Sequence, residues 1–353
     1  MTSVEQAMEV HRLAVAGREA VIARDLGRRL SRVLLPRSRF SDVADIARST
    51  LTLGPDASAF YHLGWAESST GHPRAALISY ERALHLYREA GARADEAATL
   101  NNIGHVHDNL GDRQRAVEYF RRALPISRQA GDQVGESAAL NNLGRVHDSV
   151  GDRRQALAYY ERALTLCREM GQRTGEAVAL SNIGHVHDNL GDRQPALDHF
   201  LQALPIFRDI GDRVGEAVTL SNLGRVYHSM DESQRAMEYF MHALRILREA
   251  GHRANEAVTL SNIGSVLHSW GDRPAALACY RQALAIQRDV GDRAAESVTR
   301  FNIASIHRAA GNLDEAVAEL EHVVELDRQV NHPDLESDTT VLEQVRRERD
   351  TGR

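Results

Sequence analysis

A glycine recurs every twenty residues along most of this chain, and this spacing is the feature that most restricts the fold. Half of these glycines open a Gly-Asp-Arg sequence, which is the most frequent turn. Glycine readily adopts the left-handed conformation that ends a helix, and aspartate caps the helix that follows. The spacing therefore predicts helices of about seventeen residues, roughly 25 Å long at 1.5 Å per residue, joined by tight turns. The series is Gly71, Gly91, Gly111, Gly131, Gly151, Gly171, Gly191, Gly211, Gly251, Gly271, Gly291 and Gly311, with Asp231 as the one exception.

The longer period is forty residues, because alternate helices differ. Residues 102–114 read NIGHVHDNLGDRQ, and residues 182–194 repeat all thirteen letters. The first helix of a forty-residue unit carries a large residue followed by Ile-Gly or Leu-Gly, as at Ile103-Gly104. The second carries alanine, an aromatic and alanine, as at Ala116, Phe120 and Ala123. Small residues let helices approach closely, and we expect the aromatic ring to fill the gap between repeats.

This pattern resembles the tetratricopeptide repeat. The resemblance implies an all-α fold, a right-handed superhelical α-solenoid of antiparallel helix hairpins. We assign seven forty-residue units to residues 54–331, an N-terminal helical cap or degenerate repeat to residues 1–53, and a C-terminal capping helix and tail to residues 332–353.

The first 53 residues do not match the repeat. We expect a helix over residues 1–34, interrupted near Gly17 and stopped by Pro36. A second helix is predicted to run from an N-cap at Ser41 to Leu53.

Arginine and glutamate recur eight residues apart, symmetrically about each turn between repeats. Antiparallel helices should bring the two side chains together, so we predict a ladder of ion pairs between neighbouring repeats. Exposed pairs of this kind contribute about 0–1 kcal/mol each. The pairs are Arg88–Glu96, Arg128–Glu136, Arg168–Glu176, Arg208–Glu216, Arg248–Glu256, Arg288–Glu296 and Arg328–Glu336.

Catalytic signatures are missing from the sequence. It contains no lysine, which excludes a P-loop lysine and a Schiff-base lysine, and it has no G-x-S-x-G or H-E-x-x-H motif. The string His105-Val106-His107-Asp108 resembles a metal motif, but residues two apart on a helix point about 200° apart and do not share a metal. A site built from His105, His185 and Asp108 across repeats would have Arg145 in the middle of its row. We expect no catalytic residue, metal or cofactor.

A row of asparagines is the stronger binding candidate. In related tetratricopeptide proteins this position faces the concave groove, where a carboxamide can donate to and accept from a peptide backbone. Bracing of neighbouring helices is the alternative, and both roles are compatible. The row is Asn102, Asn142, Asn182, Asn222, Asn262 and Asn302.

Two further rows follow at helical spacing. Three residues on come Trp65, His105, Arg145, His185, Arg225, Ser265 and Ser305, and three further on come Ser68, Asp108, Asp148, Asp188, His228, His268 and Arg308. The cations could contact carboxylates of a peptide and the aspartates its basic side chains. Alternatively, each cation pairs with the aspartate three residues away on its own helix. Tyr61 and Trp65 offer a surface for one apolar side chain, with core packing as the competing role for Tyr61.

The repeats with Leu-x-Asn-Ile/Leu-Gly and Gly-Asp-Arg also resemble the C-terminal sensor regions of regulators from GC-rich bacteria, both antibiotic-regulatory transcription factors and NB-ARC-type ATPases. Leu34-Leu35-Pro36 and Asn331-His332-Pro333-Asp334 fit that resemblance. It implies a module that senses a ligand or partner, although we expect no room for an NB-ARC domain in 53 residues. The units are also similar to the peptide-binding repeats of kinesin light chain and O-GlcNAc transferase.

The sequence is therefore compatible with three functions. The first is a non-enzymatic scaffold that binds a protein or extended peptide in the concave groove. The second is a peptide-responsive receptor that controls a separate effector, and the third is an enzyme with a site in the groove. With a net charge of −6, two cysteines and no long apolar run, we expect a cytoplasmic protein that contacts neither nucleic acid nor membrane. The pattern specifies no oligomeric state.

Overall fold

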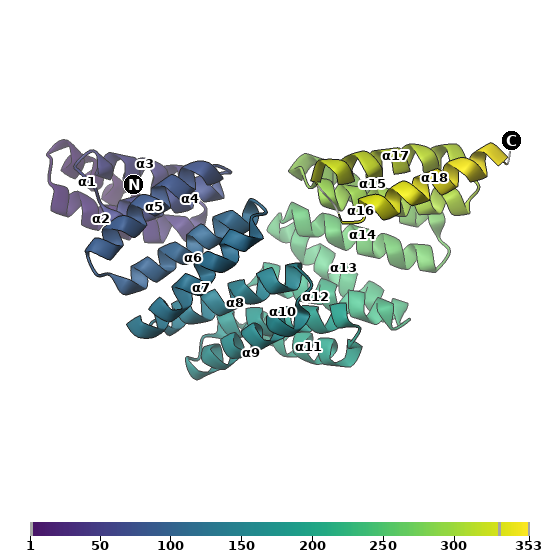
Figure 1. The fold of residues 1–353 in the computed structure, drawn as a ribbon, viewed down its shortest axis with the longest axis horizontal. Helices are drawn as coiled ribbons and strands as arrows, with labels where there is room; N and C mark the ends of the chain where they lie inside the picture. Colours follow the sequence, from purple (N-terminus) through teal and green to yellow (C-terminus); the bar gives the residue numbers. More distant parts are fainter. Residues whose placement is uncertain (1–2, 331–332, 352–353) are drawn as a thin grey trace. The chain divides into compact units, whose positions relative to one another are not determined.

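The computed structural model describes residues 3–330 and 333–351, and all regular structure in these residues is helical (Figure 1). The helices are α1 (Ser3–Ala16), α2 (Ala20–Leu34), the 3-10 helix η1 (Leu35–Arg37), α3 (Phe40–Leu51), α4 (Ala57–Ser69), α5 (Pro73–Glu89), α6 (Arg93–Asn109), α7 (Arg113–Ala130), α8 (Gln133–Ser149), α9 (Arg153–Glu169), α10 (Arg173–Leu190), α11 (Arg193–Asp209), α12 (Arg213–Ser229), α13 (Ser233–Ala250), α14 (Arg253–Ser269), α15 (Arg273–Val290), α16 (Arg293–Ala309), α17 (Leu313–Val330) and α18 (Leu335–Thr351).

The chain forms two compact units, residues 1–182 (unit 1) and 183–353 (unit 2), which meet within the sequence of α10. In unit 1, α4 packs against α5, α6 against α7 and α8 against α9. In unit 2 the corresponding pairs are α12 with α13, α14 with α15 and α16 with α17. The second helix of a pair also contacts the first helix of the next, as α7 contacts α8. The predicted all-α solenoid of helix hairpins is confirmed, while the right-handed course of the whole array stays a prediction.

The turns have the predicted backbone. All twelve recurring glycines have φ between +63° and +86°, and Asp231, the exception, has φ +62°. The aspartate after the glycine commonly accepts a hydrogen bond from the third backbone N–H beyond it, as Asp132 does from Gly135 and Asp212 from Gly215, both at 2.9 Å. These two devices end one helix and begin the next within three residues.

The helices of a hairpin approach most closely where a glycine faces an aromatic ring. A Cβ added at Gly104 would lie 2.6 Å from the ring of Phe120, and one at Gly144 would lie 2.6 Å from Tyr160. Phe120 also packs with Leu143 of the following repeat. The aromatic therefore fills the predicted space between repeats and also rests on the glycine of its own hairpin. In the last hairpin an alanine, Ala304, replaces the glycine, and Leu320 in its apolar cluster replaces the ring.

The N-terminal segment contains three helices. Gly17 follows the end of α1, and Pro36 lies in η1, as expected. The predicted N-cap at Ser41 is wrong: α3 begins at Phe40, its N-cap Arg39 makes no side-chain cap bond, and Arg39 instead binds Asp42 at 2.5 Å. An ion pair in the first turn thus takes the place of a hydroxyl cap. Because α2 contacts both α3 and α4, it has the packing partners of the first helix of a repeat.

The C-terminal helix α18 packs against α17, and its Leu342 and Val345 join the apolar cluster that contains Leu320. Residues 331 and 332, where we placed the end of the repeats, lie outside the described residues. The assigned domain boundaries stay predictions.

Candidate functional site

The predicted Arg–Glu ladder is present at the turns between repeats, and we call each of these contacts an Arg–Glu clasp. Arginine Nε lies 2.5–3.1 Å from glutamate Oε1 in all six of these pairs. The pairs are Arg88–Glu96, Arg128–Glu136, Arg168–Glu176, Arg208–Glu216, Arg248–Glu256 and Arg288–Glu296. The prediction that the eight-residue spacing joins neighbouring repeats is confirmed for these six.

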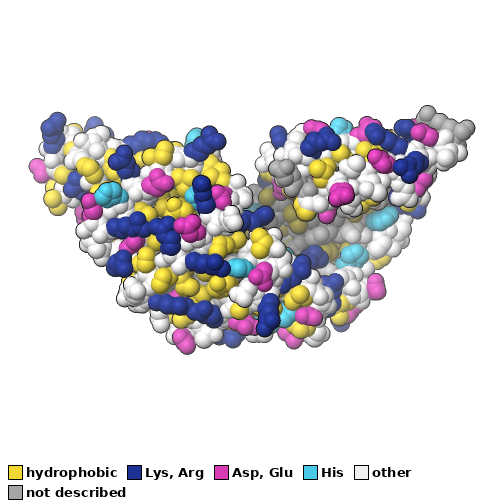
Figure 2. All heavy atoms as spheres, viewed as in Figure 1, with side chains coloured by type: hydrophobic (Ala, Val, Ile, Leu, Met, Phe, Trp, Pro, Cys, Tyr) yellow, Lys and Arg dark blue, Asp and Glu magenta, His cyan; other side chains and the backbone are white. Residues whose placement is uncertain are grey.

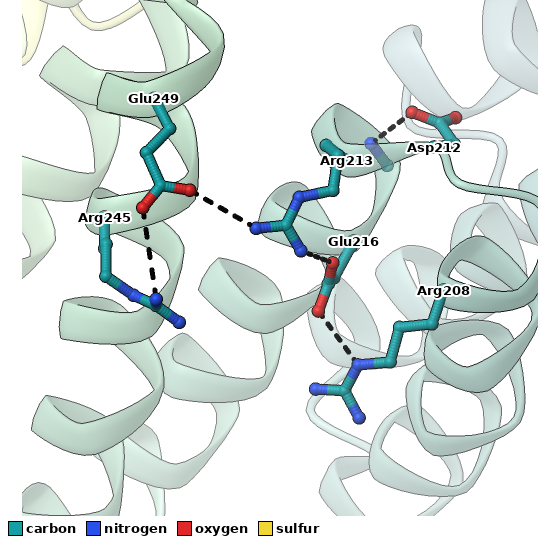
Figure 3. Close-up of polar contacts among 7 residues, drawn as sticks. Arg208, Asp212, Arg213, Glu216, Arg245 and Glu249 are labelled. Atoms are coloured by element: carbon teal, nitrogen blue, oxygen red, sulfur yellow. Dashed lines mark hydrogen bonds and ion pairs between the residues drawn. The ribbon is translucent and has the colours of Figure 1, made fainter.

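A second arginine, which the sequence analysis missed, holds the same glutamate in several clasps. Arg213 Nη1 lies 2.6 Å from Glu216 Oε2, on the side opposite Arg208, and Arg213 Nη2 reaches Glu249 of α13 at 3.5 Å (Figure 3). The signal was available, because the arginine of the Gly-Asp-Arg turn precedes the glutamate by three residues. The Glu216 side chain is only 8% exposed, so our expectation of exposed pairs was wrong for the carboxylates.

The electrostatic consequence is clearest at Glu96. Burial raises the pKa of this carboxyl, but hydrogen bonds from Arg88 and Arg93 outweigh burial and leave the pKa below its usual value. The clasp therefore stabilises a nearly buried negative charge, which is a structural role.

The seventh predicted pair does not form. Arg328 lies 3.0 Å from Glu325 on its own helix instead of contacting Glu336. Glu336 is the second residue of α18, whereas the clasp glutamates occupy the fourth position of their helices. The replacement of Gly-Asp-Arg by a sequence with Pro333 shifts this register.

The asparagine row lies on the surface formed by the first helices of successive hairpins, which we call the first-helix face of each unit. All six asparagines are partly buried. Asn102 of α6 lies near the phenols of Tyr61 and Tyr80, although its buried Nδ2 has no hydrogen-bond partner, and Asn142 of α8 lies near His105 of α6. This placement between helices suits a bracing role, and peptide binding by the row stays a prediction.

The charged rows on this face pair across repeats. In unit 1, Arg145 of α8 forms an ion pair with Asp108 of α6 and lies 3.4 Å from the His105 ring. In unit 2, Arg225 of α12 pairs with Asp188 of α10. The alternative in which Arg145 pairs with the aspartate of its own helix is therefore wrong. Stacking of the repeats places Arg145 beside Asp108. Arg145 therefore pairs with Asp108 rather than with Asp148, which lies three residues further along its own helix.

Asp188 also contacts Arg193 and is only 4% exposed. Asp108 and Asp188 are thus already engaged by arginines of this chain. Asp148 occupies the same repeat position as Asp108, and His185 occupies the same position as His105. Both have interactions of their own.

A pocket of about 360 Å³ lies on the first-helix face of unit 1, around the predicted Tyr61 and Trp65. We call it the aromatic pocket. The ring of Tyr61 makes edge contacts with Trp65 at 6.2 Å and with Tyr87 at 6.5 Å, and Trp65 remains 41% exposed. Tyr61 also packs against the apolar cluster of Tyr80, so its competing role in core packing is confirmed, while its contact with a peptide side chain stays a prediction. The lining residues are Arg28, Arg32, Leu35, Pro36, Ser58, Tyr61, His62, Trp65, Tyr87, Asp95 and Ala98.

Two opposite charges line this pocket without forming ion pairs. Arg32 of α2 and Asp95 of α6 both reach it, and neither has an ion-pair partner in the described chain. His62 also lines the pocket, is 7% exposed, and has its Nδ1 3.2 Å from Ser58 Oγ. Burial, the largest cause, lowers the pKa of His62 to about 4, with Arg32 and Arg28 lowering it further and Ser58 and Asp56 opposing. The pocket therefore combines neutral rings with one cation, Arg32, and one anion, Asp95, that have no ion-pair partner among the described residues. Its basic wall was missed because α2 does not match the repeat.

The histidine string has no ligand geometry. His107 is buried and stacks on Tyr119 with the ring centroids 5.3 Å apart, while His105 is exposed on the first-helix face. Across residues 3–330 and 333–351, no three His, Cys, Asp or Glu side chains are grouped as a metal site. Within the same residues, no helix combines the length and the apolar character needed to cross a membrane.

The sequence matches a known repeat family. The family model for the tetratricopeptide repeat matches residues 95–169, 175–249, 217–289 and 255–329. No curated protein matches the sequence.

Several solved structures share the fold. BtubC from P. vanneervenii is 22% identical with a TM-score of 0.53, over 61% of this chain and 91% of that one. Aspartyl phosphate phosphatase F from Bacillus subtilis is 14% identical with a TM-score of 0.62, over 77% and 72%. A signal transduction ATPase with numerous domains that has a tetratricopeptide repeat sensor, from Pyrococcus horikoshii, is 13% identical with a TM-score of 0.65, over 96% of this chain and 55% of that one. Because the family model covers more than half of the sequence, this chain belongs to the tetratricopeptide repeat family.

Proposed function

We propose that this protein is a non-enzymatic scaffold that binds an extended peptide of a partner protein on its first-helix face, with the aromatic pocket of unit 1 as the anchor. The observation that carries the proposal is the pair of unpartnered charges, Arg32 and Asp95, beside the exposed ring of Trp65. Binding sites commonly combine apolar and aromatic walls with a few polar groups that fix orientation.

Each group of residues in this site binds a different part of the peptide. An apolar side chain of the peptide packs on Tyr61 and Trp65. Next to it, a carboxylate binds Arg32, and a basic or amide group binds Asp95. The asparagine row of unit 1 offers amide groups to the peptide backbone beyond the pocket, which requires no particular peptide sequence.

A regulatory receptor is the second candidate. The observation that favours it is the likeness, over 96% of this chain, to a protein whose repeats are described as a sensor. In this version peptide binding changes the conformation of the array and so controls a separate effector. Cytoplasmic location suits both versions, since Cys167 and Cys279 are free thiols.

Peptide selection tests the proposal directly. A random-peptide phage library is selected on the immobilised full chain, and the enriched peptides are synthesised and titrated by calorimetry. We expect Trp65→Ala to weaken binding at least ten-fold and the combined replacement of Asn142 and Asn182, both of unit 1, by alanine to abolish it, with circular dichroism unchanged. Trp270→Ala, which alters the other exposed tryptophan, in unit 2, is the matched control.

The absence of enriched peptides, or equal affinity for the wild type and the Trp65→Ala variant, would contradict the scaffold. Small-angle scattering with the best peptide separates the two versions. Unchanged dimensions support the passive scaffold, and a changed radius of gyration supports the receptor.

A further inference from the structure

A second pocket, of about 490 Å³, lies between α7 and α8 in unit 1, and we call it the α7–α8 pocket. None of its lining residues belongs to the asparagine row or to the charged rows of the first-helix face. It is therefore separate from the proposed peptide site. The lining residues are Arg113, Gln114, Val117, Glu118, Arg121 and Arg122 of α7 and Val146, His147 and Val150 at the end of α8.

The centre of this pocket is apolar. Val117 of α7 packs against the cluster that contains Val146 and lines the pocket together with Val150, which is 58% exposed although it is a large hydrophobic residue. Figure 2 shows that arginine side chains alternate with hydrophobic ones over α7, α8 and α9. Exposed apolar surface bordered by polar residues commonly marks an interaction site.

The border of the pocket is positively charged. Arg113 and Arg121 form no ion pair with any described residue, unlike the arginines of the clasps. Arg122 lies 3.5 Å from Glu118, the one acidic lining residue, and 5.0 Å from the centre of the Tyr119 ring. Three arginines thus face one glutamate around an apolar centre.

His147 adds an unsatisfied polar atom to the wall. Its Nδ1 lies 3.4 Å from Asp152, whereas its Nε2 is buried and has no hydrogen-bond partner.

Comparison of repeats separates the features that recur in every unit from the charge at position 121, which varies. The apolar positions recur, with Leu157 in place of Val117 and Leu190 in place of Val150. The Arg121 position holds Glu161, Leu201 and Met241 in the next three repeats and arginine again at Arg281. The repeat architecture therefore explains the valines but does not require the arginine.

We propose that the α7–α8 pocket binds an acidic segment of a partner protein, with one aliphatic or aromatic side chain between Val117 and Val150 and flanking Asp or Glu residues on Arg113 and Arg121. Charge complementarity selects this occupant, because unpaired guanidinium groups bind carboxylates strongly and specifically. Glu118 within the pocket and the net charge of −6 disfavour a polyanion such as nucleic acid.

The test uses fluorescence anisotropy with the full chain and a set of labelled nine-residue peptides, each with a central Leu, Phe or Trp flanked by Asp or Glu. We expect saturable binding for at least one peptide and loss when its acidic residues become Gln or its central residue becomes Ala. Arg121→Glu installs the residue that the next repeat already carries at this position, so the fold should tolerate it, and it should weaken binding at least ten-fold. Val150→Asp should have a similar effect.

Two controls make the result specific. Arg281→Glu changes the equivalent position on α15 of unit 2 and should leave the affinity unchanged. Trp65→Ala should also have no effect, which separates this site from the aromatic pocket. The proposal is overturned by no saturable binding, by equal losses with Arg121→Glu and Arg281→Glu, or by tighter binding of duplex DNA or anionic lipid vesicles than of the peptides.

Discussion

Two regions of unit 1 use the same kinds of charged residue in opposite ways. In the clasp, Glu96 is nearly buried and is held by Arg88 on one side and Arg93 on the other. In the aromatic pocket, Arg32 and Asp95 lie at one cavity and have no ion-pair partner among the described residues. Residue type alone does not separate these cases. The presence of an internal partner does, and it distinguishes charges that hold the repeats together from charges left for a ligand.

The largest effect is expected at His62, the neutral ring in the wall of the aromatic pocket. Its pKa is about 4 in the folded chain and 6.5 as a free side chain. Below pH 6.5 the His62 ring becomes protonated in the unfolded chain but stays neutral in the folded chain. The free energy of unfolding therefore decreases as the pH is lowered. The loss approaches about 3 kcal/mol by pH 4, since one pKa unit corresponds to about 1.4 kcal/mol.

Urea denaturation of the wild type and of the His62→Gln variant, from pH 7 to pH 4, measures this contribution. The variant should lose less stability over that range. His85→Gln, which changes an exposed histidine of α5, should follow the wild-type profile. Parallel profiles for the wild type and His62→Gln would show that the ring is accessible to protons in the folded state.

The next effect tests the clasp. Glu216→Ala leaves Arg208 and Arg213 without their shared carboxylate and opens space at a side chain that is 8% exposed. We expect a loss of about 2 kcal/mol, because several hydrogen bonds to charged groups disappear while the arginines stay partly solvated. Glu238→Ala, at an exposed position of α13, is the control and should change stability by less than about 0.5 kcal/mol. An equally small effect for Glu216→Ala would mean that the clasp sets register only.

Much of this arrangement could be predicted from the sequence, because its main signals are local. The glycine spacing locates the turns, and the eight-residue Arg–Glu spacing spans a single turn. Contacts between repeats are harder to predict from the sequence, as the ion pair of Arg145 with Asp108 illustrates. The two residues are 37 positions apart, and they meet only because α8 stacks beside α6.

For a related reason, only part of the aromatic pocket could be predicted from the sequence. Tyr61 and Trp65 lie at repeat positions, so their face followed from the period. Arg32 belongs to a segment without the repeat pattern, and its approach to the pocket depends on how α2 packs against α4.

A smaller effect is expected on the first-helix face of unit 1. Arg145→Ala removes the ion pair with Asp108, and since the arginine side chain is 44% exposed we expect a loss of about 0.5–1 kcal/mol. A double-mutant cycle with Asp108→Ala, measured by urea denaturation, should give a coupling energy of the same size. A coupling of zero would place this pair with the charges available to a ligand, and would reopen the Asp row as a contact for basic peptide side chains.

The smallest effect is expected for Arg32→Ala. Arg32 is exposed and has no internal partner, so the change in unfolding free energy should stay within about 0.5 kcal/mol. It should even raise the pKa of His62 slightly, because Arg32 is one of the charges that lower it. Titration of the His62 ring by NMR in both proteins measures that shift. A destabilised Arg32→Ala variant would mean that Arg32 supports the packing of α2, and the distinction between structural and available charges would then fail at the pocket where it matters most for function.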